Sequence, residues 1–147
     1  MKKIMLSVCI TVLGLAILLF IWWLLEADRP GTVHNVQVNI GPSERFAQTE
    51  IESAADIVKV SFPSFVNSEL AYLWYDEAPS VLAIERSHLA LDQDSTIILF
   101  STIVVREPGG PGFLAPGTLE NLGWVLVRDL QSGEWELIAA GFEGLHF

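Results

Sequence analysis

An uninterrupted apolar run near the N-terminus dominates the pattern of hydrophobic and polar positions. It begins with Ile4, ends with Leu25 and contains 22 residues without a charge. As an α-helix the run would extend about 33 Å, enough to cross the hydrocarbon core of a bilayer. The pattern therefore predicts one transmembrane helix, through which the protein contacts the membrane.

Charges on the two sides of this run predict its orientation. Lys2 and Lys3 precede it, whereas Glu26 and Asp28 follow it, with only Arg29 as a nearby positive charge. Positively charged flanks stay in the cytoplasm. We therefore expect a single-pass protein of the cell membrane, with its N-terminus in the cytoplasm and its C-terminal domain outside.

A cleaved signal peptide is the alternative interpretation of the apolar run. Such peptides have an apolar region of about 7 to 15 residues, and small residues stand first and third before the cut. Here the apolar region is longer, and the best cut, after Ala27, leaves the bulky Leu25 at the third position. The sequence favours an anchor that is not cleaved.

The remaining pattern divides the chain into residues 1–25 with the anchor, a linker over residues 26–43 and an extracytoplasmic domain over residues 44–147. Residues that interrupt regular structure mark the linker: Pro30, Gly31, Gly41 and Pro42. Apolar residues also alternate with polar ones inside it, as in a short edge strand: Val36, Val38 and Ile40.

The apolar period becomes helical after the linker. Thr49 precedes Glu52 by three positions, which is the spacing of a capping box at a helix start. Apolar residues then recur at helical spacing: Ile51, Ala54, Ala55, Val58 and Phe62. Because Pro63 opposes continuation, the pattern predicts one amphipathic helix over residues 50–62.

Strand-like segments follow the helix, at residues 69–76, 95–105, 123–129 and 134–141. The last two flank a connection of hairpin length, in which Gly133 can adopt a positive φ. Residues 80–90 fit either a short helix capped by Ser80 or a loop. The order predicts an α+β domain, with one helix packed on a curved four-stranded antiparallel sheet.

Charge narrows the range of partners. The residues from Glu26 onward include 18 acidic and six basic side chains, a net charge of −12. Such a surface repels phosphate backbones, so we expect no nucleic-acid partner, whereas cations and basic peptides remain suitable. Solubility alone also explains this charge. Cys9 lies in the apolar run, so no intramolecular disulfide is expected in the outer domain.

Four segments of the chain form a recognisable set: "FAQTEIESAADIVK", "LWYDE", "ILFST" and "WVLVRDLQSGEWELIAAGF". Together they resemble an uncharacterised family of small bacterial extracytoplasmic domains with cystatin-like or NTF2-like architecture. The resemblance covers about residues 44–142 and implies a helix on a curved sheet. It implies no catalytic residues, and because NTF2-like proteins include enzymes, binders and oligomerisation modules, the fold leaves function open.

The sequence contains no assembled catalytic set. Asp76 and Glu77 are adjacent, so along a strand their side chains point to opposite faces, and we interpret them as a solvated strand end or turn. The three histidines lack metal-site spacing: His34, His88 and His146. The "PGGPG" run lacks the lysine of a phosphate-binding loop. We expect no catalytic residue, metal or cofactor, and the balance favours a protein that is not an enzyme.

Aromatic residues on the predicted sheet provide the remaining candidate site. A concave face that either packs a core or lines a pocket could form from Trp74, Tyr75, Trp124, Trp135 and Phe142. Arg128 alternates with Trp124, so it could bind an anion there, or pair with Glu134 or Glu136 across the hairpin. Core packing and an ion pair are the simpler interpretations.

These observations predict a membrane-anchored interaction domain that binds a protein or peptide, or forms a homodimer through an exposed sheet face. The anchor, the negative charge and the lack of a catalytic set favour it. The alternative is a small-molecule binder or enzyme that uses the aromatic face.

Overall fold

In the computed structural model of the chain, the described residues are 14–15, 17–18, 29–87, 90–107 and 115–141. Most of the predicted membrane span, and most of the loop that contains "PGGPG", lie outside these residues. Within the described part, no helix has the length and apolar character that crossing a membrane requires. The membrane anchor therefore stays a prediction.

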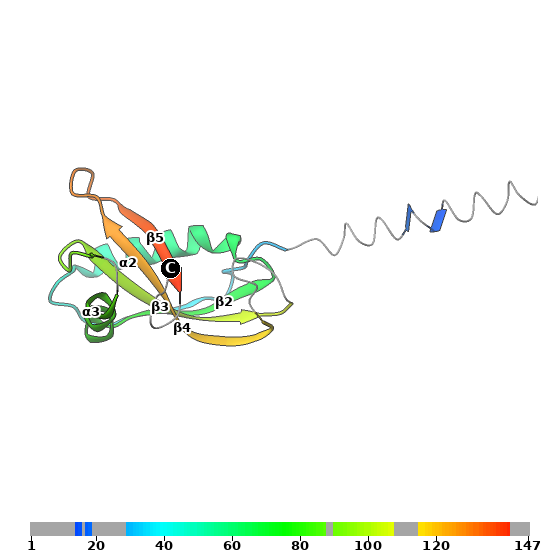
Figure 1. Cartoon of the computed structure of the whole chain (residues 1–147), viewed down its shortest axis with the longest axis horizontal. Coiled ribbons are helices and arrows are strands. Elements are labelled where there is room, and N and C mark those ends of the chain that lie inside the picture. Colours follow the sequence, from blue (N-terminus) through cyan, green and yellow to red (C-terminus); the bar gives the residue numbers. More distant parts are fainter. Residues whose placement is uncertain (1–13, 16, 19–28, 88–89, 108–114, 142–147) are drawn as a thin grey trace, which may run out of the picture.

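From residue 29 to residue 141 the described chain forms an α+β domain, which confirms the predicted class (Figure 1). Two α-helices, a short 3-10 helix and five strands follow one another in the order β1 (Gln37–Ile40), α2 (Gln48–Ser61), η1 (Phe62–Ser64), β2 (Ser68–Tyr75), α3 (Glu77–Arg86), β3 (Thr96–Val105), β4 (Gly117–Arg128) and β5 (Trp135–Gly141).

The five strands form one sheet, in the order β1-β2-β3-β4-β5. Strands β2 to β5 are the predicted antiparallel meander. Strand β1 is the predicted edge strand, and it pairs parallel to β2 because helix α2 carries the chain back between them. The prediction of a four-stranded, wholly antiparallel sheet was therefore wrong: the sheet is five-stranded and mixed, and part of the predicted linker belongs to it.

Helix α2 begins two residues earlier than predicted. Ala47 is its N-cap, and the Glu50 carboxylate three positions later accepts the Ala47 N–H at 2.8 Å. The predicted pair of Thr49 and Glu52 is thus not the capping pair. The helix ends close to the predicted place, where Pro63 lies in the short 3-10 helix η1.

Helix α3 is a second helix, which the predicted fold did not include and which begins before residues 80–90, where a short helix or a loop was expected. Asp76, not Ser80, is its N-cap and accepts the Ala78 N–H at 3.2 Å. Pro79 fits the first turn, where a helix needs no N–H donor. Ser80 is fully buried inside the helix, and its Oγ accepts the Ile98 N–H at 3.0 Å. The Ser80 hydroxyl is thus the acceptor for the Ile98 N–H of β3, which lies beyond the end of the neighbouring strand β2.

The two helices pack on opposite faces of the sheet (Figure 1). The larger core lies between α2 and the sheet, where Ala54, Val58 and Trp124 are fully buried. The smaller core lies between α3 and the other face, where Ile84 packs near Ile98. Helix α2 thus lies over one face of the sheet, and one side of the helix is next to the edge strand β1.

Candidate functional site

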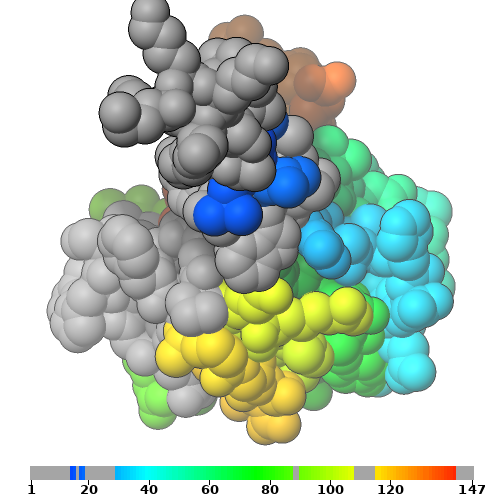
Figure 2. Space-filling view, turned by 90° about the vertical axis from the view of Figure 1, so that its right-hand side faces the viewer, coloured from blue at the N-terminus to red at the C-terminus, as the bar shows by residue number. Residues whose placement is uncertain are grey.

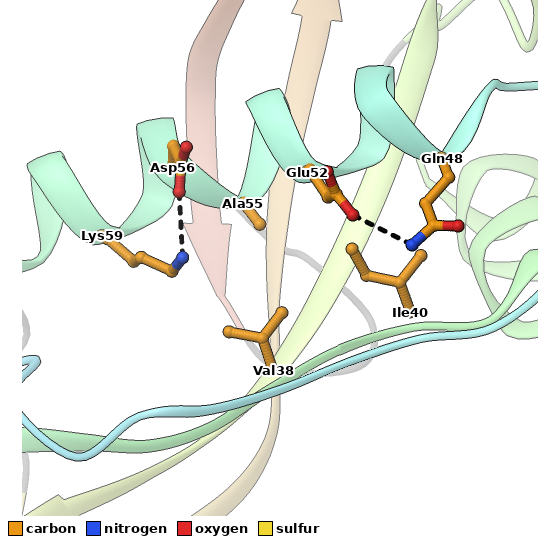
Figure 3. Close-up of a pocket in the computed structure, with 7 residues that line it drawn as sticks. All are labelled: Val38, Ile40, Gln48, Glu52, Ala55, Asp56 and Lys59. Carbon is orange, nitrogen blue, oxygen red and sulfur yellow. Dashed lines mark hydrogen bonds and ion pairs between the residues drawn. The ribbon is translucent and has the colours of Figure 1, made fainter.

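A groove with a volume of about 400 Å³ lies between strand β1 and helix α2 (Figure 3). Val38 and Ile40 project from β1 toward the helix and form one wall. The other wall is a stripe along one side of α2: Gln48, Glu52, Ala55, Asp56 and Lys59. Residues three and four positions apart share a helix side, which is why these five line one groove.

The groove stays open because of the small side chain at its centre and the short strand at its edge. Ala55 is 1% exposed and is too small to fill the space between helix and strand. Strand β1 has only four residues and is the last strand on its side of the described sheet. Val38 consequently keeps 41% of its surface exposed, although it faces the helix.

Charge is unevenly distributed along the helical wall. Lys59 Nζ lies 2.9 Å from Asp56 Oδ1, so those two charges balance each other. Glu52 accepts a hydrogen bond of 2.9 Å from the neutral amide of Gln48, which leaves its charge uncompensated within the wall. The groove therefore combines two apolar side chains of strand β1, Val38 and Ile40, with a helical wall of one net negative charge.

The structure divides the predicted aromatic residues between the two cores, and Phe142 lies outside the described residues. Trp124 is fully buried beneath α2, where its Nε1–H donates to Ser101 Oγ at 2.8 Å, and Trp135 is 7% exposed in the same core. Trp74 lies on the opposite face of the sheet and stacks on Phe100 with ring centroids 4.7 Å apart. The sequence is apolar on both faces of these strands, so it did not separate the two cores.

Arg128 lies on the α2 side near the predicted aromatic residue Trp135, but it pairs with neither Glu134 nor Glu136. Its guanidinium pairs with the Glu50 carboxylate of α2. It also lies 5.6 Å from the ring centroid of Trp135 and 5.9 Å from that of Phe46. Glu136 is opposite Val127 in the hairpin register, so its side chain belongs to the other face.

Asp76 is exposed directly after strand β2 and caps helix α3, and Glu77 is the first residue of that helix. Glu77 accepts hydrogen bonds from Ser43 Oγ and from the backbone N–H groups of Glu44, at 2.9 Å, and Arg45, at 3.2 Å. These bonds, that from Ser43 first, hold the pKa of the Glu77 carboxyl below its ordinary value. The two carboxylates thus have separate structural roles and do not form an acid–base pair.

Tyr75, the last residue of β2, is 2% exposed. This burial raises the pKa of its phenol hydroxyl above the ordinary value.

Among the described residues, no group of three or more His, Cys, Asp or Glu side chains is placed to hold a metal ion. His34 is exposed, while His88 and His146 lie outside the described residues.

Comparisons of the chain with models of protein families, with curated proteins and with solved structures find no match. The resemblance to cystatin-like and NTF2-like domains therefore stays a prediction. The groove itself is the feature that sequence reasoning missed. Its two walls had separate signals, the alternation at Val38 and Ile40 and the polar stripe of the helix, but neither signal indicates that the walls face each other.

Proposed function

We propose that the chain is a membrane-anchored extracytoplasmic interaction domain that binds a protein or peptide partner in the groove between β1 and α2. The apolar wall of the groove carries the proposal, because the exposed Val38 and the half-buried Ile40 line the groove beside a helix with a polar, acidic stripe. The anchor would be the apolar run that begins at Ile4, with the domain outside the cell membrane.

Two features make a protein or peptide a better partner than a small molecule at the aromatic residues. Trp124 is fully buried, so it offers no contact surface, and Arg128 is already paired with Glu50. The groove, in contrast, is elongated along the helix from Gln48 to Lys59, a shape that suits a chain segment. No metal, cofactor or nucleic acid enters the proposal.

We propose in addition that the domain is a variant of the cystatin-like and NTF2-like architectures. Support comes from one long helix lying over an antiparallel meander, which here is β2 to β5. The parallel edge strand β1 and the short helix α3 would be the distinguishing additions.

Site-specific photo-crosslinking of the full chain in intact cells tests the function. A photoreactive residue at Val38 should give a protein adduct of defined mass, whereas the same residue at Leu82, exposed on the distant helix α3, should not. Lack of an adduct at Val38, or the same adduct at both positions, would contradict the proposal. Protease added to intact cells tests the topology, and full protection of the C-terminal domain would overturn it.

A further inference from the structure

We infer that the partner binds as an extended segment that adds a sixth strand to the free edge of β1 and presents a lysine or arginine to Glu52. This inference rests on the proposed function and specifies how the partner is recognised. It follows from three properties of the groove: the direction of the β1 backbone groups, the apolar residues beside them and the uncompensated charge above them.

The backbone of β1 has hydrogen-bonding groups that point away from the sheet. Gly41, directly after the strand, donates its N–H to the Tyr75 carbonyl of β2 at 2.9 Å. In a parallel pair, alternate residues direct both their N–H and C=O toward the neighbour, so Asn39 also faces β2. Val38 and Ile40 consequently direct theirs outward, where the described residues supply no further strand. Such an edge is a template for pairing.

The same two residues provide the apolar contacts. The side chains of Val38 and Ile40 point toward α2, so the outward backbone groups and the apolar wall of the groove belong to the same positions (Figure 3). A strand paired with this edge would direct every second side chain into the groove. In the space-filling view, the cyan segment that contains β1 lies at the margin of the coloured residues (Figure 2). An extended segment can therefore approach it from solvent.

Charge selects a basic partner rather than a second copy of the chain. Glu52 is exposed on the helical wall and lacks a cationic partner among the described residues, whereas Asp56 is paired with Lys59. The outer segment also carries a net charge of −12, so two copies meeting at their β1 edges would repel each other. A lysine or arginine on an added strand gains attraction from both Glu52 and the overall field.

The probe is a short blocked peptide with threonine at every second position and valine or lysine at the positions between, so that a strand paired with β1 directs both valine and lysine into the groove. It is titrated into the isotopically labelled full chain in detergent micelles. Amide resonances of Val38 and Ile40 should shift on titration, together with those of the α2 stripe. The same peptide with glutamate for lysine should bind about tenfold more weakly, because attraction becomes repulsion. A lysine peptide N-methylated on the amides of one edge should lose binding, because it lacks the donors that strand pairing needs.

Two variants with matched controls isolate the two parts of the inference. Val38→Pro removes an outward N–H and leaves the donors toward β2 intact, so it should abolish binding, whereas Asn39→Ala, whose side chain faces away from the groove, should not. Glu52→Lys should remove the preference for lysine over glutamate peptides. Glu85→Lys makes the same charge change on α3 and should leave the preference in place.

Each remaining outcome counts against the inference. Failure of the lysine peptide to bind, equal binding of the glutamate peptide, or shifts confined to residues outside the groove would overturn it. Shifts of Val38 and Ile40 that depend on protein concentration without peptide would assign the edge to a second copy. If photo-crosslinking at Val38 captures a partner in cells while these tests fail, the proposed function stands and strand addition is wrong. If both fail, both are wrong.

Discussion

The Arg128 guanidinium of strand β4 pairs with the Glu50 carboxylate in the first turn of helix α2, although 78 residues separate them in the sequence. Glu50 also accepts the Ala47 N–H, so one carboxylate both caps the helix and joins it to the sheet. Arg128 covers the rings of Phe46 and Trp135 at the same time. These contacts fix the start of α2, and with it the helical wall of the groove.

Replacement of Arg128 by methionine should lower the free energy of unfolding by about 1 to 2 kcal/mol, because a half-buried carboxylate loses its partner while the apolar stem is kept. Arg106→Met is the matched control, since the Arg106 side chain is 70% exposed in its pair with Glu69. Its loss should stay below about 0.5 kcal/mol. Urea denaturation measures both free energies of unfolding. Equal losses for the two variants would show that the Arg128–Glu50 pair stabilises the domain no more than the exposed Arg106–Glu69 pair.

Ala47→Ser should stabilise the domain by about 1 kcal/mol. Ala47 has the extended backbone of an N-cap, with φ of −64° and ψ of 148°, but its side chain accepts no hydrogen bond. A serine hydroxyl would accept an N–H of the first turn and complete the capping box that Glu50 already half forms. Ala47→Val, which adds no acceptor and is as poor an N-cap as alanine, should produce no such stabilisation. A serine variant no more stable than the valine variant would contradict this description of the helix start.

Glu77→Gln should destabilise the domain at neutral pH and lose that effect in acid. The pKa of Glu77 is lower in the folded protein than its ordinary value of 4.5, so the unfolded chain takes up the proton more readily. Its contribution is therefore fully present above about pH 4.5 and disappears as the pH falls through the lower, folded value. We expect a cost of about 1 kcal/mol at pH 7. A difference between the two proteins that is constant from pH 7 to pH 3 would refute the assignment.

Ser80→Ala should cost about 1 to 3 kcal/mol, because it leaves the buried Ile98 N–H without the acceptor that lies 3.0 Å away. Ser53→Ala is the control: Ser53 is exposed on α2, and the change should be neutral or slightly stabilising there. Calorimetric unfolding of the two variants compares them directly. Similar midpoints would mean that the Ser80 hydroxyl does not support strand β3.

Most secondary structure could be predicted from periodicity, because α2 and strands β2 to β5 each have a strong local pattern. The edge strand β1 was anticipated, but its pairing depends on α2 crossing the sheet, which is a long-range event. Asp76 illustrates the limit for helix starts: it can cap α3 because β2 ends at Tyr75, whereas the predicted strand included Asp76 itself.

The candidate site was the least predictable part. Trp74 and Trp124 are both aromatic strand residues, yet they pack in different cores, and a register shift in β2 between Leu70 and Tyr72 changes which side chains share a face. Alternation shows which side chains of one strand share a face, but it does not show which faces of two different strands coincide. The groove forms because β1 and α2 lie next to each other, and the sequence of each segment alone indicates only an ordinary solvated surface.

Amide hydrogen exchange at Val38 and Ile40 in the full chain tests the central claim most directly. In the free protein both amides should exchange readily, while the Asn39 amide, directed toward β2, should be protected. With the valine–lysine peptide at ten times its dissociation constant, exchange at Val38 and Ile40 should slow about tenfold and Asn39 should change little. Strong protection of Val38 and Ile40 without peptide, or none with it, would contradict strand addition at this edge.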